Sequence, residues 1–173
     1  MNHKIYLIAA ADQKNGIGFK GKIPWDLKGD MKFFKKKTIK TDNANKLNMV
    51  VMGSTTWESL PEEHRPLSGR KNVVLAFDKN YKAEGATVAH SIEKALEEAD
   101  ERVETIFIVG GAKVYEQFAK RRDLTGIYLT RIQKEFKCDA FFPKIPPSFK
   151  PNLIKETEEN GLRYQFLLYK KGK

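Results

Sequence analysis

The stretch TIFIVGGAKVYEQFAKR, residues 105–121, decides the fold class of this chain. Residues 105–109 are apolar and largely β-branched, which predicts a buried strand, and residues 112–121 have the apolar spacing of a helix. A strand that passes through paired glycines into a helix is typical of parallel βαβ units. The glycines at 110 and 111 would let a ligand approach the backbone, and the first N–H groups of the helix would attract phosphate.

The same alternation extends over most of the chain. Further strands are predicted at residues 5–10, 48–52, 72–76, 87–89 and 126–131. Further helices are predicted at residues 27–37, 56–60 and 92–100. Asn160-Gly161 separates two strand-like segments near the C-terminus, which predicts an antiparallel hairpin. We therefore expect one α/β domain over residues 1–173, built on a mostly parallel sheet with an antiparallel C-terminal edge strand.

The composition excludes several classes of protein. Apolar residues make up 40% of the 173 residues and charged residues 31%, which is typical of a soluble globular chain rather than a disordered one. No apolar run approaches the roughly 20 residues that span a bilayer, and the N-terminal segment lacks the ordered regions of a signal peptide. The lone Cys138 excludes an internal disulfide and a cysteine zinc site, so we expect no metal and a cytoplasmic location.

The net charge of +10, from 32 basic and 22 acidic residues, indicates an anionic partner. The basic residues are spread along the whole chain, and their densest run, Lys35–Lys37, falls on an amphipathic helix. The sequence has no zinc-finger spacing and no aromatic-rich RNA-binding motif. We therefore expect a small molecule with phosphates and carboxylates as the ligand, and no nucleic acid or membrane. A polyanion-binding module remains the alternative function.

Residues 21–38, GKIPWDLKGDMKFFKKKT, place an acid on the apolar side of a helix. At about 100° per residue, Leu27, Met31 and Phe34 share one face. Asp30 falls inside this arc, and most of the lysines fall on the opposite side. A carboxylate in apolar surroundings is unfavourable unless it is paired, and burial raises its pKa. Asp30 is therefore the leading candidate for a functional acid.

Other segments offer groups for binding a ligand. In MGSTTWESL, residues 52–60, Thr55 and Glu58 have the spacing of a capping box, which predicts a second helix start beside a glycine. Residues 15–24, NGIGFKGKIP, form a glycine-rich loop that we expect to act as a lid excluding water. Arg70, in a turn region, has the planar fork suited to gripping a carboxylate.

These segments together resemble the dihydrofolate reductases. The resemblance rests on IAAADQKNGIG, IPWDLKGDMKFFKKKT, VVMGSTTWESL, RPLSGRKNVVL, IFIVGGAKVYEQF, IYLTRI and DAFFP, which follow in the order and approximate spacing of that family. It covers residues 4 to about 170. It implies an eight-stranded sheet flanked by about four helices, a monomer, NADPH as hydride donor and 7,8-dihydrofolate as substrate.

The resemblance also assigns catalytic roles. Asp30 would hydrogen-bond the 2-amino group and N3 of the pterin, since its two oxygens match these paired N–H donors. Hydride would arrive at C6, and a proton would reach N5 through water near an acid of raised pKa. Thr130 would hold Asp30 in place, and Trp25 would help to fix the ordered water. Asp30, Trp25 and Thr130 are therefore the predicted catalytic residues.

The resemblance implies two sets of binding residues. Those expected to bind the substrate are Ile8, Met31, Phe34, Lys35, Leu60, Leu67, Arg70, Val109 and Tyr115. Those expected to bind the cofactor are Ala10, Ile17, Gly18, Gly53, Ser54, Thr55, Thr56, Leu75, Ala76, Phe77, Gly110, Gly111, Ala112, Lys113, Val114 and Tyr115. Ile8 and Val109 would offer backbone carbonyls to the pterin, and Arg70 would clamp the glutamate α-carboxylate. A cis peptide is expected between Gly110 and Gly111.

The chain departs from the family pattern where the cofactor's 2′-phosphate is expected. Family members often have a basic residue directly after Met-Gly, whereas this chain has Ser54 and Thr55. The next strand commonly ends in Ser or Arg, whereas this chain continues as Ala76-Phe77-Asp78-Lys79. The two hydroxyls can donate hydrogen bonds, and Lys79 or His90 can supply charge, so NADPH remains the expected cofactor. Its advantage over NADH stays open.

One alternative shares the fold. A reductase acting on a riboflavin-pathway pyrimidine would keep the cofactor turns but has no reason to keep Pro24-Trp25, Asp30 and Arg70 together. The presence of all these residues favours dihydrofolate as the substrate.

Overall fold

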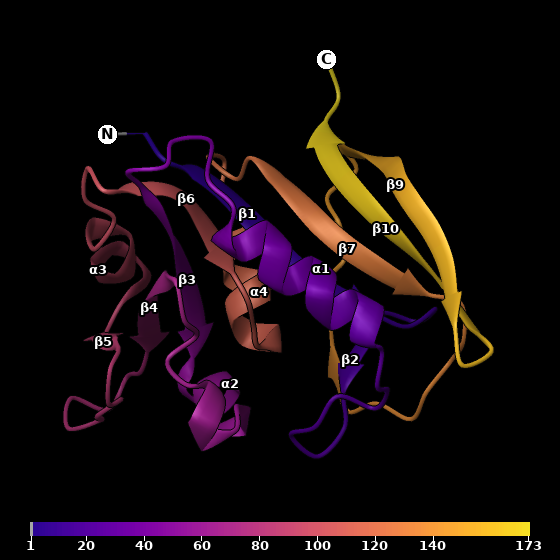
Figure 1. The fold of residues 1–173 in the computed structure, drawn as a ribbon, viewed down its shortest axis with the longest axis horizontal. Coiled ribbons are helices and arrows are strands. Elements are labelled where there is room, and N and C mark those ends of the chain that lie inside the picture. Colours follow the sequence, from indigo (N-terminus) through magenta and orange to yellow (C-terminus); the bar gives the residue numbers. More distant parts are fainter. Residues whose placement is uncertain (1) are drawn as a thin grey trace.

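The computed structural model describes residues 2–173, which form an eight-stranded sheet with helices on both faces (Figure 1). The strand order is β5-β4-β3-β6-β1-β7-β10-β9. The strands are β1 (Lys4–Ala11), β3 (Leu47–Gly53), β4 (Arg70–Leu75), β5 (Thr87–Ala89), β6 (Val103–Ile108), β7 (Gly126–Ile132), β9 (Phe149–Glu159) and β10 (Leu162–Lys171). The helices are α1 (Lys28–Ile39), α2 (Ser54–Ser59), α3 (Ile92–Glu97) and α4 (Ala112–Ala119), with a 3-10 turn at Glu62–His64.

The predicted fold class is confirmed. The strands from β5 to β7 pair in parallel, β10 runs antiparallel to β7, and β9 runs antiparallel to β10. The antiparallel strand β10 therefore lies one place inside the sheet, and β9 forms the edge. The predicted hairpin turn is present, with Asn160 and Gly161 at φ values of 52° and 75°. Such positive φ values are what a two-residue turn between antiparallel strands requires.

Both faces of the sheet are buried because side chains alternate along each strand. Leu7, Val51 and Ile108 point to the face covered by α3 and α4, where Phe118 of α4 packs against them. Their neighbours Ile8, Val50 and Phe107 point to the face covered by α1 and α2. Figure 1 shows α1 lying across the sheet. This two-sided core explains why the strand sequences are apolar throughout. Within residues 2–173, no helix is both long and apolar enough to cross a membrane.

The capping box predicted at Thr55 and Glu58 is wrong. Helix α2 begins at Ser54 with Gly53 as its N-cap, and no side chain caps it. Thr55 is therefore the second residue of the helix, where its hydroxyl is past the capping position. Glu58 instead accepts a 2.9 Å hydrogen bond from the hydroxyl of Tyr81. The helix starts earlier than predicted because β3 passes into it without an intervening loop residue.

The glycine-rich loop carries more local structure than its sequence indicates. Strand β2 (Gly16–Gly18) pairs with the short strand β8 (Ala140–Phe141), and a tight turn joins Phe19 to Lys22. The backbone N–H of Lys20 donates to both carboxylate oxygens of Asp139, at 3.3 and 3.1 Å. The loop is thus tied to the segment before β8 in this conformation. Its closure over a ligand remains a prediction.

Candidate active site

A groove of about 760 Å³ lies at the carboxyl ends of β1, β3, β4 and β6. This is the rim where ligands bind in open α/β sheets. Every residue expected to bind the cofactor lines this groove, from Ala10 on β1 to Tyr115 on α4. The sequence analysis missed further lining residues, among them Lys22 and Ile23 of the glycine-rich loop, Ser91, Ile92 and Glu93 at α3, and Gln117 of α4.

The paired glycines lie at the middle of the groove, where two strand ends meet. The expected cis peptide joins Gly110 to Gly111, and Gly53 N donates to Gly110 O at 2.9 Å. A Cβ atom on Gly53 would come within 3.2 Å of Val114, and one on Gly110 within 3.2 Å of the Thr56 hydroxyl. These contacts are tighter than most side chains tolerate, and the φ of 128° at Gly110 also favours glycine.

Helix α4 begins at these glycines. Its N-cap is Gly111, and no side chain caps the helix. The N–H groups of a first helical turn have no partner within the helix. Together with the glycine backbone, they form a donor set that fits the diphosphate of a dinucleotide cofactor. Ala112, Lys113 and Val114 of this first turn line the groove.

Asp30 lies beside the groove on α1, and its carboxylate is paired as expected. Oγ1 of Thr130, on β7, donates a 2.6 Å hydrogen bond to Oδ1 of Asp30. Burial raises the pKa of Asp30, the hydrogen bond from Thr130 lowers it, and the charge of Glu159 adds a smaller increase. The net direction is upward because loss of hydration disfavours the charged form. Asp30 is thus a hydrogen-bonded acid, and it takes up a proton more readily than an exposed aspartate does.

Two residues that the sequence did not single out hold the start of α1. Glu159, at the end of β9, accepts hydrogen bonds from Lys28 N at 2.7 Å and Gly29 N at 2.9 Å. Tyr164 of β10 donates to the same carboxylate at 3.0 Å. The backbone hydrogen bonds lower the pKa of Glu159, and burial, with its hydrogen bond to Glu159, raises the pKa of Tyr164 to about 12. No local pattern predicts this cap, since it comes from the C-terminal hairpin.

The carbonyl of Ile8 faces Tyr115. The hydroxyl of Tyr115 donates to Ile8 O at 2.7 Å, and burial raises the pKa of Tyr115. A carbonyl oxygen has two lone pairs, so Ile8 O can accept a second hydrogen bond from a ligand. Val109, the other residue expected to offer a carbonyl, lines the groove next to the glycines.

The apolar residues expected to contact the substrate pack as one group, with one exception. Ile8, Phe34, Leu60, Leu67 and Val109 belong to a single hydrophobic cluster. Met31 does not share a buried face with Leu27 and Phe34 as predicted, because its side chain is 64% exposed.

The reason for the exposure of Met31 is the way α1 packs on the sheet. Phe33 stacks on Phe166 of β10 with ring centroids 4.2 Å apart, and Leu27 packs in the same group. These contacts turn Phe33 inward in place of Met31. A contact between Met31 and the substrate stays a prediction.

Arg70 is fixed beside α1 at the start of β4. Its Nη1 donates to the hydroxyl of Thr38 at 2.9 Å, and its Nε donates to Ser68 O at 2.9 Å. Burial lowers the pKa of Arg70, although a guanidinium stays charged at neutral pH. Lys35 is exposed on α1, one turn from Thr38. Trp25 is half-buried, with its ring edge-on to Phe136 at 5.3 Å.

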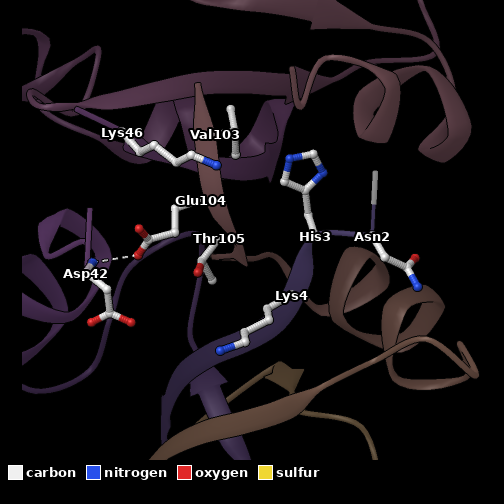
Figure 2. A pocket seen from close by; sticks show the side chains of 8 residues that line it. All are labelled: Asn2, His3, Lys4, Asp42, Lys46, Val103, Glu104 and Thr105. Atoms are coloured by element: carbon white, nitrogen blue, oxygen red, sulfur yellow. Dashed lines mark hydrogen bonds between the residues drawn. The ribbon is translucent and has the colours of Figure 1, made fainter. Parts of the chain in front are cut away.

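A second hollow, of about 260 Å³, lies at the opposite rim, where β1 and β6 begin (Figure 2). Its charged side chains are of both signs, including Lys4, Lys46 and Glu104. Glu104 accepts hydrogen bonds from the backbone N–H groups of Asp42 and Asn43, at 2.7 and 2.9 Å. These contacts hold the loop before β3, so we assign this hollow a structural role.

Comparison with known proteins agrees with this geometry. The family model described as dihydrofolate reductase matches residues 4–171. Dihydrofolate reductase of Aedes albopictus is 37% identical, with 97% of each chain covered. Dihydrofolate reductase of Drosophila melanogaster is 38% identical over 95% of this chain and 96% of that protein, and the Bos taurus protein is 35% identical over the same shares. This chain belongs to the dihydrofolate reductase family.

Proposed function

We propose that Asp30, Thr130 and Trp25 form the catalytic centre at which this chain reduces dihydrofolate. Membership of the family makes the chain an oxidoreductase that converts dihydrofolate to tetrahydrofolate. The observation that supports our assignment of the centre is the partly buried hydrogen bond between Thr130 and Asp30, next to the groove-lining residue Ala10 with which Thr130 pairs.

In this proposal Asp30 orients the pterin through its 2-amino group and N3. NADPH, when bound, supplies the hydride that C6 receives. Burial raises the pKa of Asp30, so this carboxyl group exchanges a proton more readily than an exposed aspartate while the ring takes up its proton at N5. That proton arrives through water, and Trp25 helps to fix the ordered water. Thr130 keeps the carboxyl group of Asp30 directed at the ring.

The remaining substrate contacts divide by chemistry. The carbonyls of Ile8 and Val109 accept hydrogen bonds from the pterin. Phe34, Leu60, Leu67 and Met31 contact the pterin and aminobenzoyl rings. Arg70 binds the glutamate α-carboxylate, with Lys35 nearby. Two hydrogen bonds that fix the guanidinium of Arg70 support this assignment.

We propose NADPH as the cofactor of this groove. The uncapped first turn of α4 and the glycine backbone at residues 53, 110 and 111 support binding of its diphosphate. Lys113 adds a positive charge at the same turn. Ala10, Ile17 and Gly18 flank the nicotinamide.

We also propose that the chain works as a cytoplasmic monomer on small molecules, without binding nucleic acid or a membrane surface. The free thiol of Cys138 supports a reducing compartment. The monomeric state rests on the family resemblance alone.

The proposal is tested by following the loss of reduced nicotinamide absorbance with dihydrofolate and NADPH present. We expect oxidation of NADPH that depends on dihydrofolate. Asp30→Asn should slow hydride transfer by roughly 100-fold or more at neutral pH, the order of effect of a lost acid group, and should leave NADP⁺ affinity unchanged. Asp26→Asn, at an exposed neighbouring acid, is the matched control and should keep the rate.

Turnover of a riboflavin-pathway pyrimidine instead of dihydrofolate would replace the proposed substrate. Equal loss of hydride transfer and NADP⁺ affinity in Asp30→Asn would contradict the role given to this residue. Salt-sensitive binding to duplex DNA or RNA, with no dinucleotide binding, would favour the polyanion-binding alternative.

A further inference from the structure

The direction of the cofactor in the groove follows from the proposed function, on which this inference rests. Ala10 of β1 pairs directly with Thr130 of β7, the residue that holds Asp30. The reacting nicotinamide must therefore lie at the Ala10 end. The groove continues past the paired glycines to the carboxyl end of β4 and the start of α3, where it is lined by Ala76, Phe77 and residues 91–93. This far end is where the adenosine half of the cofactor lies.

The far end is acidic. Among the described residues that line it, Glu93 is the charged side chain, and the others are Ser54, Thr55, Ala76, Phe77, Ser91 and Ile92. The basic lining residues of the groove are Lys22, in the glycine-rich loop, and Lys113, at the turn that faces the diphosphate. An adenosine 2′-phosphate would thus meet a carboxylate and hydroxyl groups.

Basic residues near this end in sequence do not line it: Lys79, two residues after Phe77, is outside the groove lining, and Lys94 and His90 have partners of their own. Lys94 lies one residue after Glu93, and its Nζ is 2.8 Å from the carboxylate of Glu97. The Nδ1 atom of His90 lies 2.7 Å from the carbonyl of Ala76, within hydrogen-bonding distance.

Dinucleotide sites distinguish the two cofactors by charge. An acidic side chain accepts a hydrogen bond from the ribose 2′-hydroxyl of NAD, whereas an arginine accommodates the 2′-phosphate of NADP. Without a cation, the phosphate exchanges its hydration for hydrogen bonds from neutral hydroxyls, which contribute little net free energy. The hydroxyls of Ser54 and Thr55 can bond to either group.

We infer that this chain takes NADH as well as NADPH, because Glu93 can accept a hydrogen bond from a ribose 2′-hydroxyl, whereas a 2′-phosphate meets only the hydroxyls of Ser54 and Thr55 as donors among the side chains that line this end. The net charge of +10 attracts the more negative NADPH over long distances, and salt screens that attraction. NADH is therefore the second hydride donor of the same site. The difference in affinity between NADPH and NADH should become smaller as the ionic strength rises.

The test is the affinity of the purified protein for NADP⁺ and NAD⁺, measured by calorimetry at physiological salt. We expect dissociation constants within about tenfold of each other, a difference of one charged contact or less. Binding of NADP⁺ roughly 100-fold or more tightly than NAD⁺ would overturn the inference and leave the reductase assignment intact. Binding of neither dinucleotide would overturn the inference together with the proposed function of the groove.

Two Glu→Arg variants test whether Glu93 itself sets the preference between the two cofactors. Glu93→Arg should tighten NADP⁺ binding by roughly tenfold, because it adds a charge-assisted contact to the 2′-phosphate, and should weaken NAD⁺ binding, because it removes the acceptor of the ribose 2′-hydroxyl. Glu101→Arg makes the same change of charge at an exposed residue that does not line the groove, and should alter neither affinity. An equal effect of the two variants on NADP⁺ would show that net charge is responsible, and would overturn the role of Glu93.

Discussion

Thr130 and Asp30 are joined by a 2.6 Å hydrogen bond although 100 residues separate them in the sequence. The sheet fixes Thr130, which is buried in β7, and α1 brings Asp30 to it. The bond lowers the pKa of Asp30, but burial raises it by more. The pair therefore combines two properties that a catalytic acid needs, which are a fixed orientation and a proton held to higher pH.

Replacing Thr130 separates these properties. Thr130→Val removes the hydroxyl that stabilises the ionised form of Asp30, so the pKa of Asp30 should rise further. If the protonated acid supports hydride transfer, the rate falls as pH rises through this pKa, and the fall should move to higher pH in the variant. Thr130→Ser keeps a hydroxyl and should restore the original profile. The measurement is the single-turnover rate against pH, and an identical profile for Thr130→Val would refute the positioning role.

The buried acid also makes stability depend on pH. The pKa of Asp30 is raised in the folded state, so between about 3.9, the pKa of an exposed Asp, and the higher folded value the folded protein holds more protons than the unfolded chain. Stability therefore falls as pH rises through this window. Asp30→Asn removes this dependence, so it should be more stable than the parent at neutral pH, with the gain shrinking toward low pH. Urea unfolding at several pH values checks this, and a gain that does not depend on pH would count against the raised pKa.

The sequence predicted those parts of the molecule that depend on local pattern. The strand β5, the hairpin turn at Asn160-Gly161 and the glycine turn at residues 110–111 lie where the pattern indicated. The inward direction of Asp30 could be predicted from helical spacing, because the positions of the apolar residues within α1 alone place Asp30 on its apolar side.

The features that were missed depend on contacts between distant segments. Glu159 caps α1 because the C-terminal hairpin folds back to it, and neither residue 28 nor residue 159 carries a local sign of this. Met31 is exposed because Phe33 stacks on Phe166. Helical periodicity alone does not decide which of the two apolar residues, Met31 or Phe33, faces the sheet. Glu93 joins the groove only because α3 lies at the end of β4 and β5.

Arg70 gives a prediction about the substrate's tail. Arg70→Leu should weaken dihydrofolate binding by roughly 10- to 100-fold, the effect of losing a charge-assisted clamp, and should hardly change the binding of a pteridine without the glutamate. The helix should persist, because the Thr38 hydroxyl also donates to Phe34 O at 2.8 Å. Arg65→Leu, which removes a nearby arginine bound to Trp57 O, is the control. Fluorescence titration with dihydrofolate and with the pteridine measures both affinities. Equal weakening of the two would show that Arg70 does not bind the glutamate carboxylate.

The last prediction concerns the contact between Gly29 and Tyr164 at the start of α1. A Cβ atom added at Gly29 would collide with the hydroxyl of Tyr164, and it would lie 3.2 Å from the carboxylate of Glu159. Alanine is favoured over glycine within a helix by about 1 kcal/mol, yet overpacking costs about 1–3 kcal/mol, so Gly29→Ala should destabilise the protein.

Tyr164→Phe removes the colliding hydroxyl. In that background Gly29→Ala should cost less than it does alone, so the two substitutions should be non-additive in a double-mutant cycle of unfolding free energies. The collision would also displace Glu159 from the N–H groups that it caps, which should lower single-turnover rates by moving Asp30. Strict additivity of the two substitutions would mean that α1 shifts freely and that the Glu159 cap does not fix the position of Asp30.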